Sequence, residues 1–375
     1  MKILLVHNII SPYKVFLCNE IAKLIDNFSV IFIAETEKIR EWRTNFSEIN
    51  FHFSLLFPQK RIEDISLIEL TRKLLKNLRS ENPDILIIDG YSHIGFWIAM
   101  LWGKFNNKKL VLWSSTTEQD KKRFFLKELF KKFFIKQFHY ANVYGTKSKN
   151  YLEKLGFESD KIFIMGNVTD NNFYSENCYN FRREKDNIIK EFNLLPNNFI
   201  FVGRFAPEKN IFTLLQAYKE AEIERYNWGL ILVGGGPINE GIKNYIVKNN
   251  LKKVFLPGFL DKKELCKFYA VSDVLVLPSL SETWGLVVNE AMSCGLAIIV
   301  SLNCGCYPDL VKDGVNGFSF NPHNKEELKN IMLSIVKGGY NLENLKRNSL
   351  KIINDFTLES AAKIVKKTID LLSIK

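Results

Sequence analysis

The chain has 375 residues, which predicts two domains at roughly 100–200 residues each. Apolar residues make up 46% and charged residues 25%, and these values exclude a disordered or a fibrous chain. No apolar run reaches the roughly 18–20 residues that a membrane span needs. The net charge is +11, and residues 121–136 hold seven Lys or Arg and one Glu. Because the excess is concentrated there, we predict no nucleic-acid partner.

The first apolar run, Ile3 to Val6, predicts a buried strand rather than a signal peptide. His7 and Asn8 interrupt the run, and no small-residue cleavage site follows. We therefore predict a cytoplasmic protein with reduced thiols, since its cysteines form no Cys-x-x-Cys pair. The cysteines are Cys18, Cys178, Cys266, Cys294, Cys304 and Cys306.

Short apolar runs alternate with longer amphipathic stretches in the first part of the chain. Strands are predicted at 2–7, 28–34, 84–89, 109–113, 141–145 and 161–165. Helices are predicted at 13–25, 64–80, 94–104, 122–138 and 146–155. Because the runs are rich in Ile, Leu and Val, we predict a parallel sheet that helices cover on both faces. Residues 1–168 would form this first domain.

The same alternation returns after a polar stretch at 168–197, which we interpret as a linker. Strands are predicted at 198–202, 229–233, 252–256, 274–277 and 297–300. Helices are predicted at 209–223, 238–249, 261–270, 285–294 and 324–337. We therefore predict a second domain over 178–355. The predicted fold consists of two Rossmann-like, doubly wound domains that face a cleft. A last helix is predicted at 357–372, within the segment 356–375. One option for this helix is to pack back on the first domain.

Two glutamates, Glu282 and Glu290, flank the start of a predicted helix after the strand 274–277. A carboxylate in the loop can accept hydrogen bonds from sugar hydroxyls, and one on the helix can hold a ribose diol. The helix N-terminus offers free N–H groups to a phosphate. The alternative for each glutamate alone is an ordinary surface position beside a capped helix.

Arg204 and Lys209 lie in one loop between a strand and a helix. The planar fork of Arg204 and the mobile charge of Lys209 suit a diphosphate, whose leaving charge must be stabilised when a glycosidic bond breaks. No Asp-x-Asp follows a strand of the second domain and no His/Asp cluster has metal-ligand spacing, so we predict no metal and no cofactor beyond a co-substrate.

These segments together resemble the retaining glycosyltransferases of family 4, which have the GT-B fold. The spacing from Glu282 to Glu290 matches the Glu-x7-Glu motif of that family. Four further segments resemble its phosphate loop, Gly-rich turn, base-contacting segment and closing loop: 201–210, 234–237, 255–259 and 309–318. The resemblance covers about 200–320 densely. It implies that the donor is bound by Gly203, Arg204, Lys209, Gly258, Phe259, Glu282, Thr283, Trp284, Gly285, Leu286 and Glu290.

The first domain resembles a subgroup with a Pro-Tyr-Arg start, in which Lys14 of this chain replaces the Arg. Asp89 and His93 follow the third predicted strand of this domain, where many members have His-x-His. Both are candidates to touch the reacting sugar, with helix capping and loop packing as their alternatives. The family is generally interpreted as using front-face substitution without an enzyme nucleophile.

Residues 121–138 predict an amphipathic helix with a wide apolar face and many lysines. Such a helix can lie on an anionic membrane or pack its phenylalanines on the sheet, and both alternatives stay open. An anionic membrane surface is thus one predicted partner, at the inner face of the cell membrane.

The resemblance implies a metal-independent hexosyltransferase that uses a UDP- or GDP-linked sugar. Its acceptor would be a sugar or a lipid-linked saccharide, in assembly of surface polysaccharide, lipopolysaccharide or glycolipid. The alternative is a non-catalytic sugar-nucleotide-binding partner of a membrane assembly complex. A nicotinamide dehydrogenase is disfavoured, because no Gly-x-Gly-x-x-Gly follows a strand.

Overall fold

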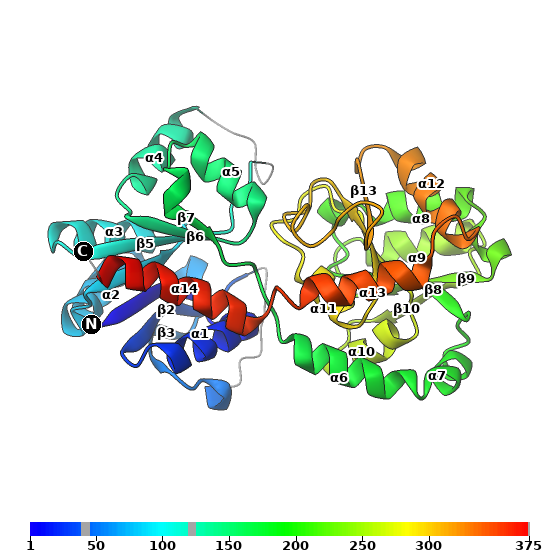
Figure 1. Ribbon diagram of the computed structural model, residues 1–375, viewed down its shortest axis with the longest axis horizontal. Helices are drawn as coiled ribbons and strands as arrows, with labels where there is room; N and C mark the ends of the chain where they lie inside the picture. Colours follow the sequence, from blue (N-terminus) through cyan, green and yellow to red (C-terminus); the bar gives the residue numbers. More distant parts are fainter. Residues whose placement is uncertain (39–45, 119–124, 374–375) are drawn as a thin grey trace. The chain divides into compact units, whose positions relative to one another are not determined.

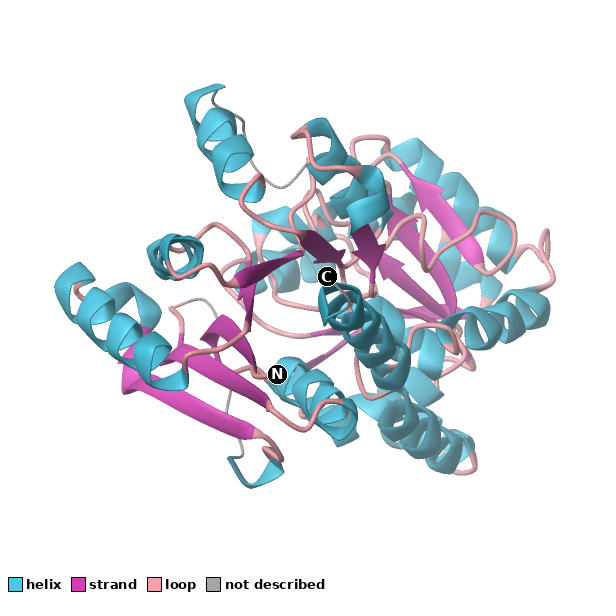
Figure 2. Ribbon diagram, turned by 60° about the vertical axis from the view of Figure 1, so that its left-hand side comes forward, coloured by secondary structure: helices cyan, strands magenta, loops and turns pink. Residues whose placement is uncertain are grey.

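The computed structural model describes residues 1–38, 46–118 and 125–373. Its contacts divide the chain into two compact units. The first unit contains residues 1–169 and 356–375, and the second contains residues 170–355. The second unit therefore begins at Asp170, eight residues before the predicted boundary at 178. In both units helices lie on the two faces of a sheet (Figure 2).

The first unit contains a seven-stranded sheet in the order β3-β2-β1-β4-β5-β6-β7. Its paired strands are parallel, with Leu5 of the central strand opposite Val30 and Ile87. The strands are β1 (Ile3–Ile9), β2 (Phe28–Thr36), β3 (His52–Arg61), β4 (Ile85–Asp89), β5 (Lys109–Ser114), β6 (Tyr140–Val143) and β7 (Ile162–Ile164). Sequence order reverses between β1 and β4, so a switch point lies there.

Alternate strand residues of this sheet pack against four helices on one face. These helices are α2 (Leu67–Glu81), α3 (Ile94–Phe105), α4 (Phe125–Ile135) and α5 (Thr146–Lys154). Leu4, Ile88 and Leu112 share one buried cluster with Leu74 of α2 and Phe96 of α3. The period of two along the strands thus gives each face of the sheet its own apolar layer.

The C-terminal helix α14 (Leu358–Ser373) returns to the first unit and packs beside α1 (Pro12–Leu24), as Figure 1 shows. Val365 and Ile369 of α14 are buried, and Asn142 of β6 donates a hydrogen bond to Thr368 Oγ1 over 2.7 Å. The last helix therefore covers the sheet of the first unit although 186 residues of the second unit precede it.

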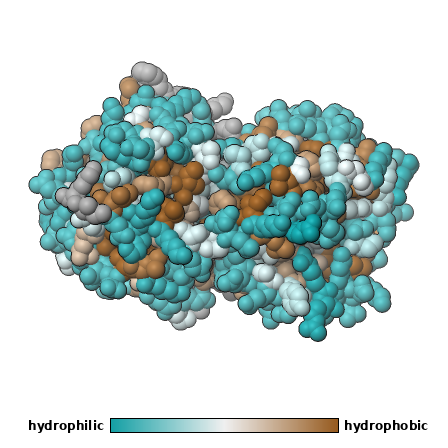
Figure 3. All heavy atoms as spheres, viewed as in Figure 1, coloured by the Kyte–Doolittle hydropathy of each residue, from teal (hydrophilic) through white to brown (hydrophobic). Residues whose placement is uncertain are grey.

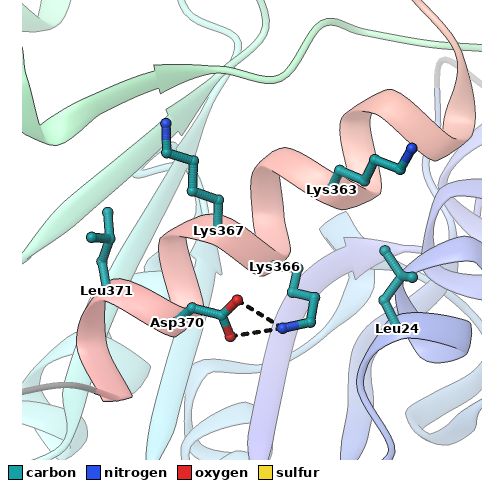
Figure 4. Close-up of a pocket in the computed structure, with 6 residues that line it drawn as sticks. All are labelled: Leu24, Lys363, Lys366, Lys367, Asp370 and Leu371. Atoms are coloured by element: carbon teal, nitrogen blue, oxygen red, sulfur yellow. Dashed lines mark hydrogen bonds and ion pairs between the residues drawn. The ribbon is translucent and has the colours of Figure 1, made fainter.

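A shallow hollow of about 280 Å³ opens between α14 and α1 (Figure 4). Lys363, Lys366 and Lys367 rim it, and Lys366 is held by Asp370 at 2.7 Å. None of the predicted site residues lines it. Hydrophilic side chains cover most of the face on which α14 lies, with hydrophobic patches between them (Figure 3).

The second unit contains a six-stranded sheet in the order β10-β9-β8-β11-β12-β13. Its strands are β8 (Asn197–Val202), β9 (Trp228–Val233), β10 (Val254–Gly258), β11 (Val274–Leu277), β12 (Ala297–Ser301) and β13 (Gly317–Phe320). The helices that flank it are α6 (Asn171–Arg182), α7 (Lys185–Glu191), α8 (Ile211–Glu220), α9 (Asn239–Lys248), α10 (Lys262–Ala270), α11 (Leu286–Ser293), α12 (Lys325–Val336) and α13 (Leu342–Ile353). All of its strand pairs are parallel.

Several elements differ from the sequence prediction. The stretch interpreted as a linker contains the helices α6 and α7. The sequence does not reveal α6 because this helix buries only Tyr174 and Cys178, which leaves a weak apolar period. The strands β3 and β13 and the helix α13 were not predicted. The basic helix is α4 over Phe125–Ile135, shorter than 122–138, and residues 119–124 lie outside the described part of the chain.

The prediction that all six cysteines are reduced thiols is wrong in this structure. Cys178 and Cys294 form a disulfide between α6 and the C-terminal end of α11. The two residues are 116 positions apart, so their contact depends on helix packing that local sequence does not show. Cys18, Cys266, Cys304 and Cys306 are free and buried.

Within the described residues, no helix has both the length and the apolar composition required to cross a bilayer.

Candidate functional site

The predicted donor residues lie at the carboxyl edge of the second sheet. Sequence order reverses between β8 and β11, which are hydrogen-bonded neighbours. Arg204 and Lys209 follow β8, and Glu282 follows β11. The predicted residues therefore flank the switch point, where ligands bind in open parallel sheets.

The loop after β8 and the loop after β11 are joined by their backbones. The Leu280 N–H donates to the Glu208 carbonyl oxygen over 2.8 Å. Lys209 closes a short 3₁₀ turn (Pro207–Lys209) just before α8. This connection brings Lys209 and Glu282 together although 73 residues separate them.

Lys209 and Glu282 form an ion pair, in which Lys209 Nζ donates to Glu282 Oε2. Both side chains are mostly buried, with 17% and 18% exposure. A lysine ammonium has three donors, so Lys209 can hold Glu282 and still donate to a phosphate oxygen. The pair places a positive charge and a hydroxyl acceptor side by side.

Arg204 pairs with Glu208 over 2.9 Å, and both side chains are exposed to more than 40%. Exposed ion pairs stabilise by only roughly 0–1 kcal/mol. The guanidinium can therefore turn toward an anionic ligand at small cost.

The glycines after β9 allow this edge to pack closely. A Cβ on Gly234 would lie 2.0 Å from the Gly203 oxygen, and one on Gly236 would lie 2.5 Å from the Phe205 oxygen. The Phe205 N–H donates to the Gly235 oxygen over 2.8 Å. The Gly-rich turn thus supports the loop after β8 through backbone contact.

The loop after β12 supports the loop that carries Glu282. The Gly305 N–H donates to the Glu282 carbonyl oxygen over 2.8 Å, and the Cys306 N–H donates to the Trp284 oxygen over 3.1 Å. A Cβ on Gly305 would lie 1.8 Å from the Thr283 oxygen. Only a glycine permits this approach, and no sequence motif marks it.

The segment from Thr283 to Leu286 leads into α11. Thr283 is exposed and Leu286 is partly exposed. Gly285 is the N-cap of α11 with φ of 97°, a conformation that favours glycine. The Trp284 side chain, a predicted donor contact, is instead buried at 2% exposure, and its Nε1 donates to Asn289 Oδ1 over 2.9 Å. We therefore assign the Trp284 indole to the support of the loop.

Glu290 lies on α11, partly exposed, with two tyrosines behind it. The Tyr269 hydroxyl donates to Glu290 Oε2 over 2.9 Å, and the Tyr174 hydroxyl also hydrogen bonds to this carboxylate. Burial raises the pKa of Glu290 to about 7, although both tyrosine hydrogen bonds act to lower it. The sequence prediction contained neither tyrosine, since α6 and α10 show no motif at these positions.

Phe259 follows β10 and is 88% exposed. Gly258, just before it, accepts a hydrogen bond from the Gly234 N–H over 2.9 Å. An aromatic ring this exposed at the carboxyl edge of the sheet is available to stack on a base.

Asp89 and His93 belong to the first unit. Asp89 ends β4 at the switch point, where its carboxylate lies 2.9 Å from Lys14 Nζ and 2.8 Å from His7 Nδ1. Lys14 also donates to the Tyr144 hydroxyl over 2.6 Å and lies 4.6 Å from the centre of the Trp113 ring. Asp89 is therefore an ion-pair partner rather than a helix cap.

The charges of this buried cluster stabilise one another. Burial alone would raise the pKa of Asp89, but Lys14 and His7 hold it well below its ordinary value. Burial lowers the pKa of His7, so this imidazole is neutral at pH 7. The cluster is a buried Lys14–Asp89 ion pair beside a neutral histidine.

His93 caps α3. Its Nδ1 accepts a hydrogen bond from the Gly95 N–H over 3.1 Å, and burial lowers its pKa. The capping role that the sequence offered as the alternative for Asp89 thus belongs to His93, for which loop packing was the expected alternative.

The helix α4 divides its phenylalanines between the core and the surface. Phe134 is buried against Trp97, with ring centres 4.7 Å apart. Leu129, Phe130 and Phe133 are exposed to 47%, 64% and 54%. The packing alternative thus describes the buried face of this helix, while a second face leaves apolar side chains exposed to solvent.

Among the described residues, no group of three or more His, Cys, Asp or Glu side chains is placed to hold a metal ion.

Comparison with known proteins identifies a family model and several relatives of this chain. Residues 182–352 match the family model described as glycosyl transferases group 1. An uncharacterized glycosyltransferase of Methanocaldococcus jannaschii is 29% identical over 225 residues, 60% of this chain and 57% of the relative. An alpha-monoglucosyldiacylglycerol synthase of Acholeplasma laidlawii is 32% identical over 151 residues, 40% of this chain and 37% of that protein. The matches thus span about half, or less, of the length of these relatives.

A solved Anabaena structure, in complex with UDP and glucose, resembles the whole chain. The TM-score is 0.75 at 19% identity, over 99% of both chains. Likeness at this identity shows a shared fold, which is the GT-B fold predicted above.

Proposed function

We propose that this chain transfers a hexose from a nucleoside diphosphate sugar to a hydroxyl acceptor. The match of residues 182–352 to the family model of glycosyl transferases group 1 supports this proposal. The observation that carries the proposal is the Lys209–Glu282 pair at the switch point of the matched domain. Lys209 and Arg204 bind the diphosphate, Glu282 binds the transferred sugar, and Glu290 binds the ribose diol. Phe259 stacks on the base. The donor is UDP- or GDP-linked, and UDP-sugars are tested first because the Anabaena protein of the same fold was solved with UDP.

The proposed reaction retains the configuration at the anomeric carbon. The acceptor oxygen attacks this carbon from the face that the phosphate leaves, and the departing phosphate oxygen takes the acceptor proton. Lys209, Arg204 and backbone N–H groups stabilise the negative charge of the leaving diphosphate. Because the chain itself supplies this positive charge, we expect turnover to survive excess EDTA.

The proposed acceptor is a saccharide or lipid-linked saccharide used for surface polysaccharide, lipopolysaccharide or glycolipid, bound by the first unit. The Acholeplasma relative named as a glycolipid synthase supports this choice. We further propose peripheral attachment to the inner face of the cell membrane through α4. Its exposed Phe130 and Phe133, with Lys132 and Lys136 beside them, have the composition of an interfacial helix.

The test is donor binding and slow donor hydrolysis by the purified chain. UDP-glucose or GDP-mannose at 100 times its dissociation constant should stabilise the protein by about 2.7 kcal/mol in a thermal shift assay. Free sugar should accumulate, and both Lys209→Met and Glu282→Gln should abolish most of this release. Lys243→Met, an exposed lysine paired with Glu240 on α9, is the matched control.

Binding without hydrolysis or transfer would support the non-catalytic alternative. Binding of neither sugar nucleotide would contradict the proposed donor. Complete loss of turnover in EDTA, restored by Mg²⁺ or Mn²⁺, would contradict the proposed source of positive charge.

A further inference from the structure

Three helices of the second unit meet behind Glu290. The carboxylate projects from α11, Tyr269 comes from α10, and Tyr174 comes from α6. Both tyrosines are almost completely buried, and their rings are 6.4 Å apart in an edge-to-face arrangement. Tyr269 Oη approaches Oε2 of Glu290, so this oxygen is engaged from inside the protein.

A disulfide joins two of these helices, α6 and α11, one helical turn away from Tyr174 and Glu290. Cys178, four residues after Tyr174 on α6, is disulfide-bonded to Cys294, four residues after Glu290. Cys294 Sγ also lies 3.5 Å from the Tyr174 carbonyl oxygen. The disulfide therefore holds α6, which carries Tyr174, against the C-terminal end of α11, which carries Glu290.

We propose that Tyr269 and Tyr174 are positioning residues for Glu290, which hold its carboxylate ionised and oriented to accept hydrogen bonds from the ribose diol of the donor. This inference rests on the proposed function, since it assumes that Glu290 binds the donor. Neither tyrosine touches the donor in this assignment, and both act through Glu290. A buried carboxylate without such donors would take up a proton and lose part of its capacity as an acceptor.

The ionisable groups around Glu290 determine how pH affects the site. Lys262 of α10 favours the charged carboxylate, as both tyrosines do, while burial opposes it and raises its pKa to about 7. Glu290 and Asp261 raise the pKa of the nearby Cys266 thiol, after burial as the main cause, to about 12. The tyrosine pKa values are also raised, by burial and by Glu290, so both hydroxyls stay protonated at neutral pH.

Donor affinity should consequently rise with pH and reach a plateau above the pKa of Glu290. The ionised fraction of a group with a pKa near 7 grows from about one tenth at pH 6 to about nine tenths at pH 8, a rise of about tenfold. The probe is UDP-glucose, or GDP-mannose if UDP-glucose does not bind. Calorimetry measures the dissociation constant of the full chain from pH 5.5 to 9.

Tyr269→Phe and Tyr174→Phe should shift this rise to higher pH and weaken binding at pH 7 by about threefold or more each. Tyr218→Phe is the matched control. It removes another buried tyrosine hydroxyl of the second unit, one that donates to the Trp228 oxygen over 2.9 Å. Its pH profile should match that of the parent.

The outcomes separate this inference from the proposed function. If neither sugar nucleotide binds the parent, the proposed donor function fails. If the donor binds but both tyrosine variants keep the parent profile, only the positioning role is overturned. A pH dependence that persists unchanged in Glu290→Gln would likewise overturn it, because the titrating group would then be another one.

Discussion

The two glutamates differ in their surroundings although the motif presents them as a pair. Glu282 forms an ion pair with Lys209, whereas Glu290 accepts hydrogen bonds from the neutral hydroxyl groups of two buried tyrosines. A cation beside a carboxylate suits a position near the diphosphate, where charge changes during the reaction. A carboxylate held by neutral donors suits a diol distant from the breaking bond.

Glu282→Gln should lower kcat by roughly 10²-fold, the scale of one misplaced contact at the reacting sugar. Glu290→Gln should raise the donor KM by about tenfold with little change in kcat, because it removes a contact equally present in ground and transition states. Steady-state kinetics with the full donor separates the two effects.

The nucleoside diphosphate alone provides the control for these variants. It should bind the Glu282→Gln protein at least as well as the parent, because Lys209 keeps its charge and loses a carboxylate partner. If Glu282→Gln lost affinity for the nucleoside diphosphate while Glu290→Gln kept it, the roles assigned to the two glutamates would be reversed or wrong.

Lys14 should be essential for stability because it neutralises Asp89 inside the first unit. Lys14→Met leaves a buried carboxylate unpaired, which costs about 3–5 kcal/mol. The loss should grow as pH rises above the ordinary pKa of an aspartate, since only the ionised carboxylate needs the lysine. Urea unfolding at pH 5 and pH 8 measures it. In Lys14→Arg, which keeps the charge, most of the stability should remain, and an equal loss there would assign the effect to packing.

At the scale of elements, α6 shows how a weakly patterned helix acquires a function. Its polar sequence resembles a linker, yet it supplies a tyrosine to Glu290 and one half of a disulfide. The bridge closes a loop of 116 residues within the second unit.

Cys178→Ser should therefore lower the free energy of unfolding of the oxidised protein by about 2–5 kcal/mol. Guanidinium unfolding with and without dithiothreitol measures this difference. The reductant should bring the parent to the stability of the variant and leave the variant unchanged. A parent that does not respond to dithiothreitol would show that the bridge does not contribute.

The exposed face of α4 should be needed for attachment to anionic vesicles. Phe130→Ser combined with Phe133→Ser removes two apolar side chains that insert into the interface, so vesicle affinity should fall about tenfold or more. Co-sedimentation with phosphatidylserine vesicles measures this. Val247→Ser, which removes a side chain 79% exposed on α9, should bind as the parent does. Equal binding by all three proteins would leave α4 with a packing role only.

At the scale of the whole molecule, the chain passes out of the first unit and returns to it. The helix α14 covers one face of the sheet formed by residues 1–169. It buries five apolar side chains there: Ala361, Ala362, Val365, Ile369 and Leu372. At about 1.5–3 kcal/mol for a large apolar side chain, this burial is comparable to the whole stability of a domain.

A fragment of residues 1–169 should therefore fail to fold cooperatively, whereas residues 170–355 should fold alone. Circular dichroism during thermal unfolding distinguishes the two. Fusing residues 356–373 to the first fragment through a flexible linker should restore its transition. A cooperative transition in the fragment without α14 would contradict this account.

The sequence by itself determined the alternation of strands and helices, and with it two parallel α/β domains. That alternation is a local property, since the period of apolar residues depends on which faces each segment buries. It also placed Arg204, Lys209 and Glu282 at strand ends, because parallel strands end at one edge. Elements with a weak period, such as α6 and the partly exposed β3, were missed for the same reason.

Only the tertiary structure decided which of these residues meet. Lys209 and Glu282 are 73 residues apart, Tyr269 and Glu290 are 21 apart, and Cys178 and Cys294 are 116 apart. These contacts depend on strand order and helix packing, which the apolar period does not encode. The pairing of Asp89 with Lys14 was hidden likewise, because strand order and helix packing bring the two residues together. The burial of Trp284 was hidden although its partner Asn289 is only five residues away, because the turn at Gly285 that brings the two side chains together leaves no apolar period in the sequence.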